Sequence, residues 1–187
     1  MIIRVAGLDP SFRNWGIAVA DLDLDTGCLS TPWLHVLKTG DEPKAKQARV
    51  NSYDISAAKE LSAGNHKLLS EVKIFFVEVP VGSQSAAGMK AYGVCVGILG
   101  YMRALDATII EVTAAESKKI FAGTKTATKQ QMIDAAIELY PDANWPKHGG
   151  KVVASTAEHM ADAIAAIHAG VLTPEFTNLL TLLNKHS

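Results

Sequence analysis

Three carboxylates occur in apolar surroundings, where an unpaired charge is costly. Asp9 follows the apolar residues 2–8, Glu78 stands near the end of the segment VKIFFVEV, and Asp162 lies in an alanine-rich segment. A buried carboxylate needs a partner or a metal ion, and a lysine partner or a capped loop would explain Asp9 or Glu78 taken alone. Together, the three indicate a site for hard divalent cations, which prefer oxygen ligands and keep positions open for a substrate phosphate. Two such ions about 4 Å apart can stabilise the attacking and leaving oxygens of phosphodiester hydrolysis.

The segment around Asp162 offers a fourth group. Residues three and four apart share one face of a helix, so Asp162 can project together with His159 or with Glu158. A neutral imidazole can bind a metal ion or position an attacking water. An ordinary, partly exposed histidine would show the same spacing, so both interpretations of His159 stay open on spacing alone.

An α/β domain must position these groups. Short apolar runs predict strands at residues 2–8, 15–22, 33–37, 72–79 and 108–112, the first three as an antiparallel meander. Helical patterns occur at residues 83–105, 128–140, 156–169 and 174–183. In the second of these, Met132, Ile133, Ala136 and Leu139 lie on one side, and in the third Ser155 or Thr156 is available as the N-cap. Residues 43–69 are helix-compatible with a break at Gly64-Asn65, and residues 141–150 are predicted as a loop. The order predicts a mixed sheet, with Asp9 and Glu78 at the edge where open α/β sheets bind their ligands.

The composition predicts a single domain over residues 1–187. Hydrophobic residues make up 48% and charged residues 20%, which excludes a disordered tail, a collagen-like repeat and a disulfide scaffold. Cys28 and Cys95 form no CxxC pair, which argues against a structural zinc site. We expect no signal peptide, no membrane partner and a cytoplasmic location.

The net charge of −1 by itself argues against a nucleic-acid partner, but acids and bases are partly segregated along the chain. Residues 118–151 hold six lysines against three acids, and residues 38–49 hold four bases against two acids. A solvated face is the ordinary explanation of such a cluster.

Four blocks, in order, resemble the RuvC-like Holliday-junction resolvases of the ribonuclease H-like superfamily. They are GLDPSFRNWGIAV, VEVPVGSQSAAGMKAYGVCVG, SKKIFAGTKTATKQQM and EHMADAIAAI, which run from residue 2 to about residue 170. The blocks resemble the family's opening strand-turn-strand, its second acidic strand and following helix, its basic segment, and its last catalytic helix in the His-x-x-Asp variant. Ser11 stands where the family usually has glycine.

The resemblance implies a ribonuclease H-like fold, with a mixed five-stranded sheet of three antiparallel and then parallel strands, flanked by helices. It implies that Asp9, Glu78 and Asp162 bind metal and that His159 is the fourth catalytic and metal-binding residue. The implied cofactor is Mg²⁺, with Mn²⁺ able to substitute and two ions in each site. The implied activity is symmetrical nicking of four-way DNA junctions by a homodimer, leaving 5′-phosphate and 3′-hydroxyl ends.

The basic block and the glycine-rich helix carry the remaining implications. Lys118 and Lys129 fall on the family's phosphate-contacting lysines, with Lys119 and Lys125 beside them as further DNA-binding candidates. Residues 83–105 match the helix at the family's dimer interface. Glycine inside a helix costs about 1 kcal/mol against alanine, so either a second chain or this chain's own sheet must pack closely there. Two symmetrical cuts need two symmetrical sites, which supports the homodimer.

Other functions fit parts of the pattern. A related nuclease acting on flaps, other branched DNA or RNA/DNA hybrids would have the same site. An actin-like or sugar-kinase-like ATPase needs two such domains, for which 187 residues leave no space, and a non-catalytic junction-binding module has no use for three buried acids. Val81 stands where bacterial members often have an aromatic residue that helps to open the junction, so we expect junction handling to differ. This divergence suits a bacteriophage-encoded or organellar member, and no particular branch-migration partner is indicated.

Overall fold

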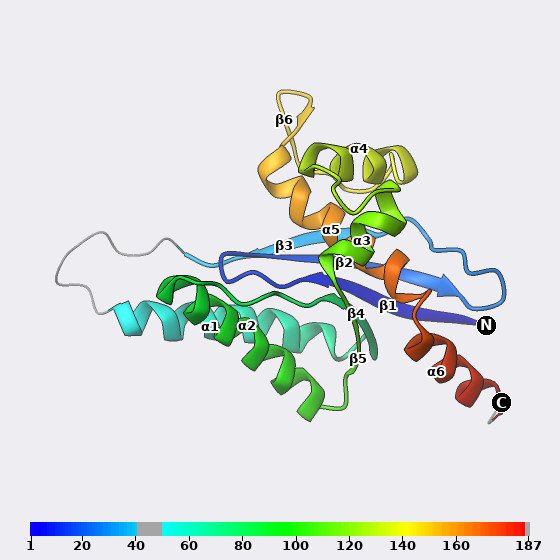
Figure 1. Cartoon of the computed structure of the whole chain (residues 1–187), viewed down its shortest axis with the longest axis horizontal. Coiled ribbons are helices and arrows are strands. Elements are labelled where there is room, and N and C mark those ends of the chain that lie inside the picture. The colour runs from blue at the N-terminus through cyan, green and yellow to red at the C-terminus, as the bar shows by residue number, and fades with distance from the viewer. Residues whose placement is uncertain (41–49, 186–187) are drawn as a thin grey trace.

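A five-stranded mixed sheet forms the centre of the fold (Figure 1). The computed structural model describes residues 1–40 and 50–185. In spatial order β3-β2-β1-β4-β5, the strands are β3 (Trp33–Lys38), β2 (Asn14–Asp23), β1 (Ile2–Asp9), β4 (Ile74–Glu78) and β5 (Thr108–Val112). The first three strands of the chain pair antiparallel, whereas β4 runs parallel to β1 and β5 parallel to β4. The predicted α/β fold with a mixed sheet is therefore confirmed.

Helices cover both faces of the sheet (Figure 1). One face of the sheet carries α1 (Val50–Leu68) and α2 (Ala86–Ala104). The other face carries α5 (Ala154–Gly170), and α3 (Ala114–Ala122) and α4 (Lys129–Leu139) pack on α5. The last helix of the described chain is α6 (Pro174–Lys185). In β4, Phe75 and Val77 pack toward α1 and α2, whereas Phe76 packs under α5. All three are fully buried, as expected of a central strand covered on both faces.

Glycines in β1 and β2 let α5 approach the sheet closely. A Cβ on Gly7 would stand 1.9 Å from the carbonyl oxygen of Ala163, and one on Gly16 would stand 2.1 Å from that of His159. Any larger residue would push the helix away. These two glycines of the first sequence block therefore set the height of α5 above the strands.

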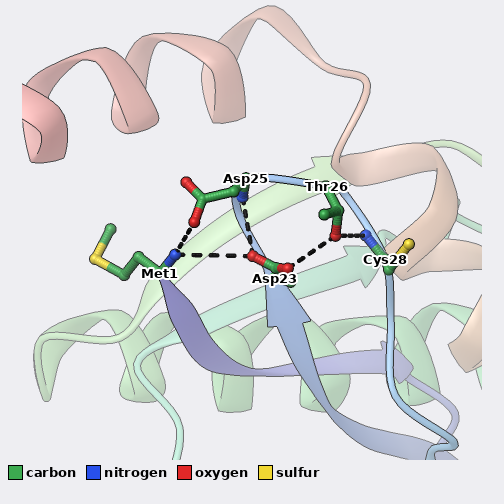
Figure 2. Close-up of polar contacts among 5 residues, drawn as sticks. All are labelled: Met1, Asp23, Asp25, Thr26 and Cys28. Carbon is green, nitrogen blue, oxygen red and sulfur yellow. Dashed lines mark hydrogen bonds and ion pairs between the residues drawn. The ribbon is translucent and has the colours of Figure 1, made fainter.

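The end of the sheet where β1 begins carries a compact polar cluster (Figure 2). The Met1 ammonium group forms ion pairs with Asp25 and, at 3.7 Å, with Asp23. Asp23 also accepts hydrogen bonds from the Asp25 amide at 3.0 Å and the Thr26 hydroxyl at 2.9 Å, and the Cys28 amide donates to Thr26 Oγ1 at 3.3 Å. These hydrogen bonds lower the pKa of Asp23 below its ordinary value.

The structure overturns two predictions about helices. The expected break at Gly64-Asn65 is wrong, because α1 continues through both residues. Gly64 lies against the side chain of Leu37, and the buried Asn65 donates a hydrogen bond to the Leu61 carbonyl at 2.9 Å. The expected N-caps of the last catalytic helix are also wrong: α5 begins at Ala154 after Val153, with no side-chain capping hydrogen bond, so Ser155 and Thr156 lie inside its first turn.

Other boundaries shift more modestly. The predicted loop 141–150 contains β6 (Lys147–His148), which pairs with β7 (Lys151–Val152), and the basic block contains α3 as a separate helix. Leu139 is 52% exposed and does not share the buried side of α4. The predicted helical residues 43–49, with three bases of the 38–49 cluster, lie outside the described residues. Within the described residues, no helix is both long and apolar enough to cross a membrane.

Candidate active site

The carboxyl ends of β1 and β4 bring two acids to one edge of the sheet. Asp9 is the last residue of β1 and Glu78 the last of β4. The strands are parallel neighbours in which Leu8 pairs with Val77, so the two acids follow paired residues. α5 packs on both strands and carries His159 and Asp162. The structure therefore places the four predicted catalytic residues at one site.

Asp9 and His159 form the best-defined contact of the site. His159 Nδ1 lies 2.7 Å from Asp9 Oδ2, and both side chains are 17% exposed. Burial alone would lower the pKa of His159, but the hydrogen bond and charge of Asp9, together with Glu158 and Asp162, raise it above the ordinary value. The contact with Asp9 fixes the orientation of the imidazole ring, with Nε2 on its other side.

Glu78 and Asp162 resist ionisation. Burial raises the pKa of each to about 7, and the negative charge of Asp9 adds to the rise in both. Asp162 acts in the same direction on Glu78. Such carboxyls ordinarily ionise near pH 4. The site therefore holds more negative charge than its own side chains neutralise, and a bound cation would relieve the repulsion.

Ser117 on α3 is a site residue that the sequence interpretation missed. Its side chain is fully buried, and it lowers the pKa of Glu78 through a polar contact. That contact falls short of ordinary hydrogen-bond geometry, so the hydroxyl has no hydrogen-bond partner among the described residues. Helical spacing could have indicated that Ser117 is buried, because it lies four residues before Phe121 and therefore on the same side of α3, and Phe121 is partly buried.

Two of the four predicted lysines reach the acids. Lys118 is partly buried, and its charge lowers the pKa of both Glu78 and Asp162. Lys129 Nζ lies 2.8 Å from Glu158 Oε2, and this ion pair raises the pKa of the lysine. Lys119 and Lys125 are exposed and form no ion pair within the described residues.

Glu158 is the other acid of α5. The helical spacing left open whether it or His159 projects together with Asp162. It pairs with Lys129, and its Oε1 lies 3.6 Å from His159 Nε2. Asp162 and His159 thus face the strand carboxylates, whereas Glu158 links the site to the basic block. Val81, in the connection between β4 and α2, is 86% exposed.

The donor set fits a hard divalent cation in its chemistry. Three carboxylates and an imidazole come from β1, β4 and α5, and the raised pKa values of Glu78 and Asp162 mark charge that a dication would stabilise. The side chains do not form a finished cage: no three histidine, cysteine or acidic side chains of residues 1–40 and 50–185 converge on one metal position. Asp9 Oδ2 is instead engaged by His159.

The fold is similar to solved structures of Holliday-junction resolvases. RuvC of T. thermophilus in complex with a Holliday junction substrate matches with a TM-score of 0.61 and 17% identity, over 90% of this chain and 93% of that chain. A structure of Thermus thermophilus RuvC matches with a TM-score of 0.56 and 16% identity, over 90% and 92%. The yeast mitochondrial Holliday junction resolvase Ydc2 matches with a TM-score of 0.53 and 12% identity, over 95% and 86%.

No protein-family model and no curated protein sequence matches the chain. At 12–17% identity, the solved structures establish the fold. The chain has the ribonuclease H-like fold in the form found in RuvC. The resemblance carried by the four sequence blocks is confirmed at the level of the fold.

Proposed function

We propose that this protein is a metal-dependent endonuclease that resolves four-way DNA junctions by paired nicks. The observation that carries the proposal is the group of Asp9, Glu78 and Asp162 at the carboxyl edge of a RuvC-like sheet, where burial and mutual repulsion raise the pKa of two of the three acids to about 7. A protein that only bound DNA would gain nothing from such a site, because buried acids destabilise the fold and repel phosphate.

The side chains suit hydrolysis of a phosphodiester. Asp9, Glu78 and Asp162 would hold Mg²⁺ or Mn²⁺, which when bound supplies charge stabilisation to the transition state and a more acidic water. His159, oriented by Asp9, accepts the proton of the attacking water at Nε2. The water oxygen bonds to phosphorus and the bond to the 3′ oxygen breaks, which leaves a 5′-phosphate and, after protonation, a 3′-hydroxyl.

The lysines near the site suit the DNA itself. Lys118 lies beside the buried carboxylates, where it can contact the phosphate being cut. Lys129 is held at the edge of the site by its ion pair with Glu158. The exposed Lys119 and Lys125 would contact phosphates farther from the cut. Lysine suits phosphate as a compact positive charge with three donors.

The outer side of α2 supports a homodimer. Among residues 1–40 and 50–185, a Cβ on Gly93, Gly97 or Gly100 would meet no atom within 4 Å, so packing within this described part of the chain does not explain these glycines. Met89 and Tyr101 on the same helix are 46% and 42% exposed. A two-fold dimer through this side would compensate the helical cost of the glycines and supply the two sites that paired nicking needs.

One substrate panel tests the proposed activity. Labelled four-way junction, flap, RNA/DNA hybrid and linear duplex are incubated with the protein, with Mg²⁺, with Mn²⁺ and with EDTA, and the product ends are mapped. We expect metal-dependent, symmetrical nicks in the junction alone. Preferential cutting of flaps or hybrids would identify a related nuclease, and binding without cutting would identify a binding module.

The dimer is tested separately by sedimentation of the wild type and of Gly97→Leu. The wild type should sediment as a dimer, free or on a junction, and the variant should nick junctions without a coordinated second cut. A wild type that is monomeric at micromolar concentration in both conditions would contradict the dimer but leave the nuclease proposal standing.

A further inference from the structure

A short basic hairpin stands at the start of the catalytic helix. β6 and β7 pair Lys147 with Val152 and His148 with Lys151, and α5 follows directly (Figure 1). The turn residues Gly149 and Gly150 have φ values of +55° and +79°. Two successive positive φ angles favour glycine and belong to the tight turn that matches the twist of a two-stranded hairpin. The glycine pair therefore defines the shape of the tip.

The base of this hairpin is anchored in the protein. Trp145 is 5% exposed in the core under α5, and its indole donates to the Tyr140 carbonyl at 2.8 Å. Asn144 pairs through both side-chain atoms with the backbone of Leu34 in β3, at 2.7 and 2.8 Å. Buried aromatic packing and paired hydrogen bonds hold an element in one orientation. The hairpin is thus presented outward on a fixed base.

The tip itself is uniformly basic and has no internal partner. Lys147, His148 and Lys151 are all exposed, and within the described residues none of them forms an ion pair or a side-chain hydrogen bond. Because side chains alternate along a strand, Lys147 lies on one face of the hairpin and Lys151, with His148, on the other. Positive charge therefore faces outward on both sides of the ribbon.

One more lysine lies near the start of α5, between the hairpin and the candidate active site. Lys38, the last residue of β3, contacts the Thr156 hydroxyl at 3.3 Å in the first turn of α5. Thr156 and His159 are three residues apart and share a side of that helix. At 1.5 Å per residue, the five residues from Ala154 to His159 span only about 8 Å.

We infer that the hairpin of residues 147–152 binds the backbone phosphates of the duplex arm next to the cut. This inference rests on the proposed function. The hairpin lysines have no partner among the described residues and stand on a fixed base close to the proposed site of phosphodiester cleavage. Such lysines fit a polyanion that extends beyond that site. The hairpin binds the duplex arm, while Lys118 and Lys129 lie near the phosphate that is cut.

The test compares two double variants with the same loss of charge. Lys147→Ala with Lys151→Ala removes the hairpin lysines, and Lys67→Ala with Lys73→Ala removes two exposed lysines near the start of β4, at the other end of the sheet. Binding of a labelled four-way junction, with Ca²⁺ in place of Mg²⁺, is measured from low to high salt. Each lost phosphate contact lowers the log–log slope by about 0.9 on duplex DNA, so the hairpin variant should lose about 1.8 and the control variant nothing.

Two further measurements test whether the effect comes from the positive charge of the hairpin and is confined to DNA binding. Lys147→Arg with Lys151→Arg should restore the slope, because the positive charge is kept. The single-turnover cleavage rate at saturating protein should stay within about twofold for the alanine variant, because the hairpin does not touch the reacting atoms.

The outcomes separate the two proposals. Equal slopes for the wild type and the hairpin variant, in a protein that cuts junctions, would overturn the hairpin inference alone. A wild type that neither binds nor cuts branched DNA would overturn the proposed function first.

Discussion

The two ends of the central sheet both carry acids, in opposite electrostatic states. At the end where β1 begins, Asp23 and Asp25 are met by the Met1 ammonium, backbone amides and a threonine hydroxyl (Figure 2), and the pKa of Asp23 falls. At the end where β1 finishes, the pKa values of Glu78 and Asp162 rise to about 7. The same residue types are satisfied at one end and left short of positive charge at the other.

This difference separates acids that the fold itself satisfies from the acids of the proposed site. An exposed acid with nearby donors stabilises a turn and needs nothing further. A buried acid beside two others costs stability, and such groups persist where a ligand or a reaction needs them. Substitutions at the two ends of the sheet should therefore have very different effects.

Neutralising the buried acids should abolish cleavage. Asp9→Asn, Glu78→Gln and Asp162→Asn should each lower the junction cleavage rate by about a thousandfold, because several kcal/mol of metal-assisted stabilisation is lost. Junction binding should persist or tighten, since repulsion of phosphate is relieved. Asp23→Asn and Asp25→Asn are the matched controls and should stay within about twofold of the wild type. Substantial Mg²⁺-dependent cleavage by Glu78→Gln would contradict the site.

His159 should matter less than the carboxylates but more than its neighbour. His159→Ala should lower the cleavage rate by at least about tenfold, as expected for loss of one proton-transfer or positioning group. Glu158→Ala should be closer to the wild type, because Glu158 pairs with Lys129 rather than with the strand acids. A severe defect in Glu158→Ala beside a nearly normal His159→Ala would show that the faces of α5 have been assigned wrongly.

The lysines that reach the acids should contribute more to DNA binding than the exposed ones. Alanine at Lys118 or Lys129 should lower the salt-dependence slope of junction binding by about 0.9 each, because each loses one phosphate contact. Lys119→Ala and Lys125→Ala should have smaller effects, since neither side chain is held at the site. An unchanged slope in the double variant of Lys118 and Lys129 would assign both to ordinary solvated surface.

The two ends of the sheet should respond oppositely in stability. Asp162 is ionised above about pH 4 in the unfolded chain but only above about pH 7 in the folded one, so its cost to the fold grows between these values. In EDTA at pH 8, Asp162→Asn should raise the melting temperature by at least about 2 °C, the shift produced by 1 kcal/mol in a domain of this size. At pH 4 the gain should vanish.

Ionisation of Asp23 should have the opposite effect on the stability of the fold. Its lowered pKa adds stability above the unfolded value near pH 4, and that stability is lost as the pH falls through the folded value. Asp23→Asn should therefore lower the melting temperature slightly at pH 8. A rise in both variants at pH 8 would show that the two ends do not differ as described.

Much of the fold was predictable from local patterns. Short apolar runs located the five strands, whereas the close packing of α5 over Gly7 and Gly16 was not predicted and became visible only in the structure. Local rules failed at two helix positions, and only one of them has a tertiary contact that explains it. Gly64-Asn65 continues α1 because Leu37 packs on Gly64 and Asn65 bonds to the preceding turn, and α5 begins without the expected side-chain cap because the hairpin feeds directly into it.

The sequence by itself determined the candidate residues, because a carboxylate at the end of an apolar strand has few explanations and the helical period allows few partners on α5. Only the tertiary structure decided which of them lie together. It placed His159 rather than Glu158 against Asp9, buried Ser117 beside Glu78, paired Glu158 with Lys129, and projected the basic hairpin from the first turn of α5. The physical reason is that spacing along one element fixes which side a residue occupies, whereas distances between elements depend on how closely α5 packs on β1 and β2. That packing is set by contacts between residues about 150 positions apart.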